Sequence, residues 1–371
     1  MSMNTTPKGE RIHIALFGRR NAGKSNLINA ITGQDLTIVS DVLGTTTDPV
    51  YKAMEILPLG PVMLIDTPGL DDEGVLGEER IKKARSVLNK TDLALIVADG
   101  NEAAKDFSFE HQILALTKKK NIPSIVVLNK QDLWDENEAA IQAYGDLCVS
   151  SKTGYHIHEL KELMTTKLPT DDQTGKIVGD LLSPLDFVVL VVPIDSAAPK
   201  GRLILPQQQV IRDLLDIGAM PFVCRESELS ETFAKLKEAP ALVITDSQVF
   251  PLVDRLTPPQ VRLTSFSILF ARYKGDLKQA AEGAKALEMI QDGDPILISE
   301  GCTHHRQCGD IGTEKLPDWI RQYTGKAPEF HFTSGTEFPE DVSGYKLIVH
   351  CGGCMLNARE MKSRLRSAAD Q

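Results

Sequence analysis

The chain has 371 residues, which is too long for one typical hydrophobic core and predicts two or three domains. Hydrophobic residues make up 42% and charged residues 25%, as in ordinary globular proteins. The formal net charge is −10, and this acidity disfavours broad nucleic-acid binding, because such binding depends on basic residues that release counterions from phosphates.

Membrane and secretory classes are also disfavoured. The apolar runs are too short to span a bilayer, and the N-terminus lacks the basic patch, apolar block and cleavage site of a signal peptide. Six cysteines in a chain of this length do not indicate a disulfide framework. We therefore expect a cytoplasmic protein with no membrane partner and no nucleic-acid partner.

The first domain is predicted over residues 1–170. Short apolar segments alternate there with helical patterns, and their continuous β-branched character is typical of parallel strands covered by helices on both faces. These segments read RIHIALFG, PVMLIDTPG, DLALIVADG, PSIVVLNK and DLCVSS. The polar stretch LPTDDQTGK, residues 168–176, then indicates a linker.

Two further α/β alternations follow. One covers residues 177–259, from the strand DFVVLVVPID to the TPP at its end. The other covers residues 260–371, begins at RLTSFSILFARY and closes with a helix from about 355 to 368. The predicted fold class is thus α/β, with three α/β domains, of which the first has a mostly parallel sheet.

The segment GRRNAGKS, residues 18–25, fits the phosphate-loop pattern G-x-x-x-x-G-K-[ST] between a strand and a helix. Its glycines permit a tight turn whose N–H groups surround phosphates. Lys24 neutralises the β and γ phosphates, and the Ser25 hydroxyl is placed to bind magnesium. This motif alone leaves ATP and GTP both open.

Later motifs favour GTP. In NKQD, residues 129–132, the aspartate can accept both the N1–H and the 2-amino group of guanine, whereas adenine offers no such pair. SSK, residues 150–152, resembles the last guanine-contacting element of GTPases. DTPG, residues 66–69, places an aspartate near magnesium and a glycine N–H near the γ-phosphate. GTTTD, residues 44–48, offers a threonine to magnesium. Five elements in this order predict a GTPase.

The spacing and loop chemistry resemble the Era and MnmE GTPases. In those relatives the asparagine matching Asn21 binds potassium, and the threonine matching Thr46 binds magnesium. Leu70 stands where Ras-like enzymes carry a water-orienting glutamine. The resemblance therefore implies that potassium supplies the missing charge.

The predicted catalytic residues are Lys24, Thr46 and Gly69. The predicted magnesium ligands are Ser25, Thr46 and Asp66, and the predicted potassium ligand is Asn21. The residues predicted to bind GTP come from all five motifs, and they are Asn21, Ala22, Gly23, Lys24, Ser25, Asn26, Thr45, Thr46, Asp66, Gly69, Asn129, Lys130, Asp132, Ser150, Ser151 and Lys152.

A second group of candidate residues lies near the end of the chain. Cys302-Thr-His304 and His350-Cys351-Gly-Gly-Cys354 each follow an apolar strand, so both can lie at one edge of a parallel sheet. Three interpretations compete: buried thiols, a zinc site of three cysteines and one histidine, and a 4Fe-4S cluster. We favour the cluster, held by Cys302, Cys351 and Cys354, with His304 or His350 as a possible fourth ligand.

The combination of this GTPase with C-x-H…H-C-x-x-C resembles the FeFe-hydrogenase maturation GTPase family, HydF. The resemblance implies a homodimer that associates through the middle domain. It also implies that a di-iron precursor, made by two radical S-adenosylmethionine maturases, is delivered to the hydrogenase apoprotein. The alternatives are an Era-like GTPase of RNA modification or ribosome assembly with a structural zinc, and a redox-sensing switch.

Overall fold

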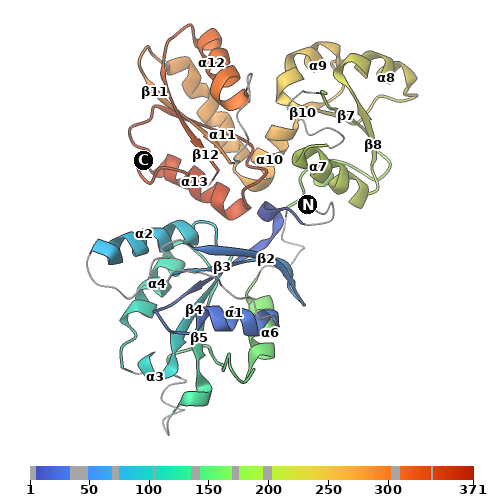
Figure 1. Ribbon diagram of the computed structural model, residues 1–371. Helices are drawn as coiled ribbons and strands as arrows, with labels where there is room; N and C mark the ends of the chain where they lie inside the picture. Colours follow the sequence, from blue (N-terminus) through green and yellow to red (C-terminus); the bar gives the residue numbers. More distant parts are fainter. Residues whose placement is uncertain are drawn as a thin grey trace. The chain divides into compact units, whose positions relative to one another are not determined.

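The computed structural model describes residues 6–33, 49–68, 75–103, 105–134, 143–168, 175–194, 203–301, 310–335 and 337–371. The chain divides into two compact units, Met1–Gln173 and Thr174–Gln371 (Figure 1). The first unit carries the phosphate-loop motif, and the second carries the cysteine motifs.

A six-stranded sheet forms the first unit, with the order β2-β3-β1-β4-β5-β6. β2 runs antiparallel to β3, and the other neighbouring strands are parallel. The strands are β1 (Ile12–Phe17), β2 (Val50–Ile56), β3 (Gly60–Asp66), β4 (Leu93–Asp99), β5 (Ser124–Asn129) and β6 (Leu147–Cys148). The helices are α1 (Lys24–Thr32), α2 (Val75–Leu88), α3 (Gly100–Ala103), α4 (Ser108–Lys119) and α6 (Ile157–Lys167), with short 3-10 turns η1 (Lys8–Glu10) and η2 (Gln131–Leu133).

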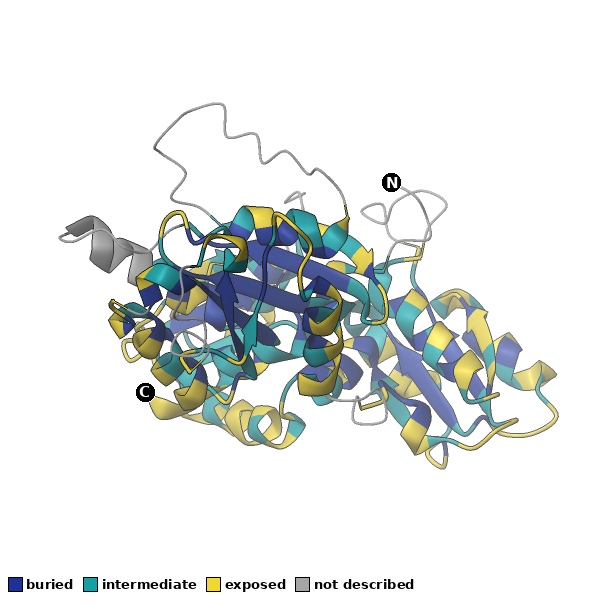
Figure 2. Ribbon diagram, turned by 90° about the horizontal axis from the view of Figure 1, so that it is seen from below, coloured by how far each residue is buried: buried dark blue, intermediate teal, exposed yellow. Residues whose placement is uncertain are grey.

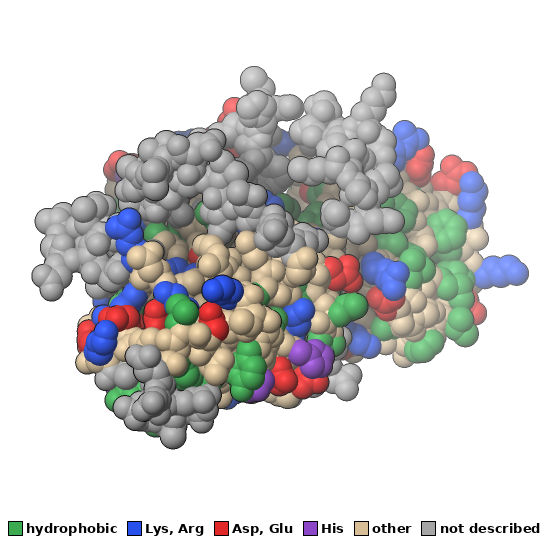
Figure 3. Space-filling model, turned by 60° about the horizontal axis from the view of Figure 1, so that its bottom comes forward, with side chains coloured by type: hydrophobic (Ala, Val, Ile, Leu, Met, Phe, Trp, Pro, Cys, Tyr) green, Lys and Arg blue, Asp and Glu red, His purple; other side chains and the backbone are tan. Residues whose placement is uncertain are grey.

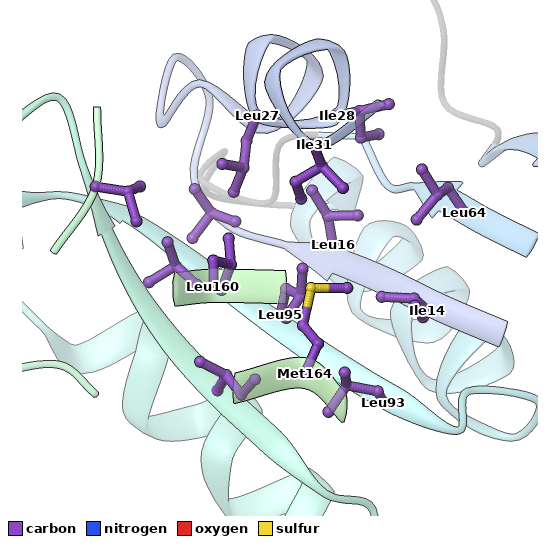
Figure 4. Close-up of a cluster of buried hydrophobic side chains, with 14 of the residues drawn as sticks. Ile14, Leu16, Leu27, Ile28, Ile31, Leu64, Leu93, Leu95, Leu160 and Met164 are labelled. Atoms are coloured by element: carbon purple, nitrogen blue, oxygen red, sulfur yellow. The ribbon is translucent and has the colours of Figure 1, made fainter. Parts of the chain in front are cut away.

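Successive residues of the central strands face opposite helical layers, because side chains alternate along a strand. Ile14 and Leu16 of β1 belong to the core cluster under α1 and α6, whereas Ala15 and Phe17 belong to the cluster under α2 and α4. Figure 4 shows α1 directing Leu27 and its neighbours into the first of these clusters. Both faces of the sheet are therefore apolar and buried, as Figure 2 shows for the strands, and this confirms the predicted α/β class.

The second unit contains two smaller sheets, both parallel. Their orders are β10-β9-β7-β8 and β12-β11-β13. The elements of the first are η4 (Gly179–Leu181), β7 (Phe187–Val191), α7 (Leu205–Asp216), β8 (Met220–Cys224), η5 (Glu226–Glu228), α8 (Leu229–Lys235), β9 (Leu242–Thr245), η6 (Ser247–Val249), α9 (Phe250–Leu256), β10 (Leu263–Ser265) and α10 (Phe266–Lys274). Those of the second are α11 (Leu277–Ala284), η7 (Lys285–Met289), β11 (Pro295–Glu300), the π-helical η8 (Ile311–Lys315), α12 (Leu316–Thr324), β12 (Glu329–Ser334), β13 (Leu347–His350) and α13 (Ala358–Asp370).

The boundary between these two sheets lies later in the chain than residue 259, where the sequence places it. β10 pairs with β9 of the middle sheet, and α10 buries Phe266, Leu269 and Phe270 in the core cluster of that sheet. The segment that we expected to open the third domain thus belongs to the second sheet by its pairing and packing.

The three-stranded sheet brings the cysteine-bearing segments to one edge. β11 ends at Glu300 and β13 ends at His350, and the two strands pair in parallel with Ser299 opposite His350. Residues 301 and 351 therefore leave the sheet side by side, as expected from the parallel arrangement.

Candidate functional sites in the two units

The phosphate loop lies between β1 and α1, and neither of its two glycines has room for a side chain. A Cβ on Gly18 would lie 2.1 Å from the carbonyl oxygen of Val97, and a Cβ on Gly23 would lie 2.4 Å from Nδ2 of Asn129. Gly23 also has a positive φ of 89°. Only glycine permits this close turn at the start of α1, where free N–H groups favour an anion.

Lys24 is buried, with 8% of its surface exposed, and its ammonium group lies inside the loop. Its Nζ donates hydrogen bonds to the carbonyl oxygens of Gly18 at 2.8 Å and Arg19 at 2.9 Å. The positive charge is thus held where the predicted phosphates would lie.

Ser25 and Asp66 provide two oxygen ligands in contact with each other. The Ser25 hydroxyl donates to Oδ2 of Asp66 at 2.7 Å. Burial raises the pKa of the Asp66 carboxyl, while the Ser25 hydrogen bond and the charge of Lys24 act in the opposite direction. A hydroxyl and a buried carboxylate form the hard-oxygen set that suits magnesium, so these residues fit the predicted ion.

The guanine motifs meet the phosphate loop through Asn129. Its Nδ2 donates to the Ala22 carbonyl oxygen at 3.1 Å, and its Oδ1 accepts the Ser151 N–H at 3.1 Å. Oδ1 of Asp132 accepts the Ser150 hydroxyl at 2.6 Å, and Nζ of Lys152 lies 4.0 Å from the other carboxylate oxygen of Asp132. The structure therefore brings three of the predicted motifs together.

Lys130 and Asn21 flank a cavity of about 410 Å³ beside the loop. Nζ of Lys130 donates to Oδ2 of Asp99 at 2.8 Å. Asn21 is exposed and has a positive φ of 61°. Asn26 is exposed on the first turn of α1. The predicted residues Thr45, Thr46 and Gly69 lie outside the described residues.

Sequence reasoning missed the contacts that hold Arg19. Its Nη2 donates to Oδ2 of Asp106 at 2.7 Å, and its Nε lies 3.5 Å from Oε1 of Glu110. Burial raises the pKa of the Glu110 carboxyl. These partners anchor the loop residue whose carbonyl oxygen accepts from Lys24. The two acids stand far from the loop in sequence, so no local pattern could have identified them.

In the second unit, the sulfur of Cys351 accepts two backbone N–H groups. The Gly301 N–H lies 3.0 Å from Sγ, and the Gly353 N–H lies 3.4 Å from it. Gly301 immediately precedes Cys302, which together with His304 lies outside the described residues. Such N–H contacts to sulfur tune iron–sulfur centres, so this cysteine suits a metal ligand. Among the described side chains, no three His, Cys, Asp or Glu residues converge as a metal site.

His350 uses both ring nitrogens within the protein. Nδ1 lies 2.7 Å from the Cys351 carbonyl oxygen, and Nε2 lies 3.2 Å from Nη1 of Arg364. Because a guanidinium can only donate, Nε2 accepts and Nδ1 carries the proton. Burial lowers the pKa of His350 to about 4, and the charge of Arg364 acts in the same direction.

Cys354 is the second thiol of the C-x-x-C pair. Burial raises its pKa to about 11, and the neighbouring Cys351 thiol adds to the rise. The Cys354 carbonyl oxygen accepts a hydrogen bond from Nζ of Lys274 at 3.0 Å. The loop is thus held through its backbone.

Known proteins resemble the chain domain by domain. Residues 13–130 match the family model for a 50S ribosome-binding GTPase. Residues 177–275 match the hydrogen maturase F dimerization domain, and residues 278–371 match the hydrogen maturase F tetramerization domain.

Curated relatives match the first unit. The tRNA modification GTPase MnmE of Heliobacterium modesticaldum is 33% identical over 169 residues, which are 43% of this chain and 35% of the relative. GTPase Der of Xanthomonas campestris pv. campestris is 34% identical over 174 residues, which are 45% of this chain and 37% of the relative. The chain thus spans a little over a third of the length of these relatives.

A crystal structure of Aquifex aeolicus Era bound to GDP and AlF4 is also similar. It is 20% identical with a TM-score of 0.36, and the match covers 57% of this chain and 92% of that one. At this score the likeness carries no argument about function.

Among the helices that the structure describes, none combines the length and apolarity needed to cross a bilayer.

The dimerization domain is followed directly by the tetramerization domain, and the two together cover more than half of the chain. A GTPase domain precedes them. The chain therefore belongs to the hydrogen maturase F family and carries an N-terminal GTPase domain.

Proposed function

We propose that this protein is a GTPase that acts as scaffold and carrier in maturation of the H-cluster of FeFe-hydrogenase. In this proposal the C-terminal domain holds a 4Fe-4S cluster on Cys302, Cys351 and Cys354. A di-iron precursor, received from the radical S-adenosylmethionine maturases, is delivered to the hydrogenase apoprotein. Membership of the hydrogen maturase F family supports the hydrogenase-maturation part.

The observation that carries the cluster assignment is the position of the Cys351 sulfur. It accepts the N–H of Gly301 at 3.0 Å, and the next residue in the chain is Cys302. The segment that carries Cys302 therefore starts in contact with the segment that carries Cys351 and Cys354. When bound, a four-iron cluster on three thiolates offers one iron for an exchangeable ligand.

His350 is not the fourth ligand in this proposal. Its Nε2 lone pair faces Arg364, and its Nδ1 proton faces the Cys351 carbonyl oxygen, so a bond to iron through either nitrogen would break the contact that this nitrogen makes. His304 or an exchangeable external group remains for that position. His350 instead orients Cys351 through the carbonyl oxygen of that residue.

The proposed GTP site uses magnesium and potassium. Ser25, Asp66 and Thr46 would hold magnesium, and the contact between Ser25 and Asp66 supports this assignment. Asn21 would hold potassium near the phosphates. The family resemblance implies that hydrolysis of GTP would time the exchange of partners rather than the assembly chemistry, and the GTP and cysteine sites belong to different units of the chain.

The proposed homodimer forms through the middle sheet at β8. This strand lies at the edge of its sheet and exposes three apolar side chains: Met220 (37%), Phe222 (49%) and Val223 (46%). Exposed apolar side chains on an edge strand are typical of surfaces that a partner covers. The match to a dimerization domain over residues 177–275 supports a second copy as that partner.

Metal analysis of the full-length protein purified without oxygen tests the cluster. We expect brown protein with iron and sulfide in near-equal amounts and a visible charge-transfer band. Cys351→Ser should lose most of the iron. Cys224→Ser, which changes a buried cysteine of the middle sheet, should keep it.

The main alternative is an Era-like GTPase of RNA modification or ribosome assembly with a structural zinc. Colourless protein that contains only zinc would favour it. The net charge of −10 argues against this alternative. So does the mixture of acidic and basic side chains on the face that Figure 3 shows.

A further inference from the structure

Two buried cations support the cysteine loop, which we define as residues 350–356. Lys274, the last residue of α10, is 1% exposed, and Arg364 of α13 is 4% exposed. Burying a charged side chain is costly unless its environment compensates for the loss of water. Both cations nevertheless lie beneath this one loop.

Lys274 holds the end of the loop. Its Nζ donates to the carbonyl oxygen of Cys354 at 3.0 Å and to that of Leu356 at 2.8 Å. The same ammonium lies 5.6 Å from the centre of the Phe270 ring. These contacts join α10, which packs on the middle sheet, to a loop 80 residues later in the chain.

Arg364 holds the beginning of the loop. Its Nη1 faces Nε2 of His350 at 3.2 Å and Oγ of Ser299 at 3.4 Å. Its Nη2 donates to the Gly335 carbonyl oxygen and to Oε1 of Glu360, each at 2.7 Å. One guanidinium thus connects the ends of all three strands of the last sheet to α13.

We propose that Lys274 and Arg364 are positioning residues for an anionic iron–sulfur cluster on the cysteine loop. This inference rests on the proposed function. The two cations hold the loop in shape through its carbonyl oxygens and His350, and both are buried against it. An oxidised four-iron core with three thiolates carries a net negative charge, and reduction adds an electron. Nearby positive charge therefore favours the reduced cluster.

The test is a redox titration of full-length protein reconstituted without oxygen with iron and sulfide, with dithionite as the one-electron donor. Lys274→Met should lower the equilibrium constant for reduction about tenfold, a shift of about 59 mV to more negative potential. Arg364→Met should act in the same direction and also lose iron faster to a chelator. Lys274→Arg and Arg364→Lys retain the charge and should restore most of the potential.

The matched controls are exposed cations close to the tested residues, one on α11, which follows α10, and one on α13. Lys278→Met on α11 and Arg366→Met on α13 remove a similar charge at the surface and should leave potential and iron content unchanged. GTP hydrolysis, which reports on the first unit, and the far-UV circular dichroism spectrum of the full-length protein should be equal in all variants, which shows that both units are folded.

Two results would overturn the inference. One is a wild-type cluster whose potential and iron retention are unchanged in both methionine variants. The other is an equal shift in the charge-retaining and methionine variants. If wild-type protein binds no iron and sulfide at all, the proposed function itself fails, which is a different outcome. If Lys274→Met does not fold, the inference is decided by the potentials of Lys274→Arg, Arg364→Met and Arg364→Lys.

Discussion

Asn21 is the residue on which the potassium proposal depends. Its backbone has a positive φ of 61°, and it lines the cavity beside the phosphate loop. Asn21→Ala should abolish the difference between potassium and sodium, because the amide oxygen that would hold the ion is lost. We expect hydrolysis in potassium to fall about 100-fold, the effect of losing one electrostatic contact to a transition state.

The measurement is single-turnover GTP hydrolysis in matched potassium and sodium buffers. Gln112→Ala, an exposed amide on α4, is the control and should keep the wild-type response. Wild-type protein that hydrolyses GTP equally fast in both salts would show that the assigned role is wrong.

His350 illustrates how far a single residue can be interpreted from sequence. It directly precedes Cys351, so adjacency makes it a candidate ligand. Arg364 lies 14 residues later, and only the folded chain shows its guanidinium 3.2 Å from the imidazole. The partner of a buried polar group depends on packing, which the spacing of motifs does not encode.

At the scale of elements, β8 provides a test of the dimer. Phe222→Lys places a charge on the exposed surface of this edge strand, and desolvating that charge in an interface is unfavourable. We expect the variant to form a smaller oligomer than the wild type at micromolar concentration by sedimentation velocity, because the tetramerization domain over residues 278–371 is left unchanged. Leu57→Lys, at a residue that is 78% exposed in the first unit, should keep the wild-type state. An unchanged oligomer in Phe222→Lys would remove β8 from the interface.

The assignment of elements from sequence worked best where apolar runs are long and β-branched. Five strands of the first sheet coincide with the predicted apolar segments, β2 was not predicted, and the sheet is parallel apart from β2. The segment after Leu263 was harder, because a short apolar run suits either a strand or a buried helix. In the structure the Ser265 hydroxyl accepts the Ile268 N–H at 3.2 Å and caps the start of α10. The strand β10 before it therefore has only three residues.

At the scale of the whole molecule, the GTP and cysteine sites should fail independently. They belong to separate compact units, and neither site takes a predicted ligand from the other unit. Lys24→Ala should slow GTP hydrolysis at least 100-fold, because the phosphate charge loses its counter-ion, and should leave iron content unchanged. Cys351→Ser should do the reverse.

Both quantities can be measured on the same preparations, with Lys167→Ala, at an exposed lysine of α6, as the control for each. A Lys24→Ala protein that cannot be loaded with iron would contradict independent sites. It would instead indicate that nucleotide binding is needed before the cluster is assembled.

The sequence by itself determined the phosphate loop, the guanine motifs, the C-x-x-C pair and the α/β class. Each of these is a contiguous pattern whose chemistry follows from residue type and short spacing. Only the tertiary structure decided that Gly301 meets Cys351, that β10 joins the middle sheet, and that Lys274 and Arg364 lie buried beneath the cysteine loop. The physical reason is that desolvation and hydrogen-bond partners depend on residues that, in these contacts, lie up to 82 positions apart along the chain.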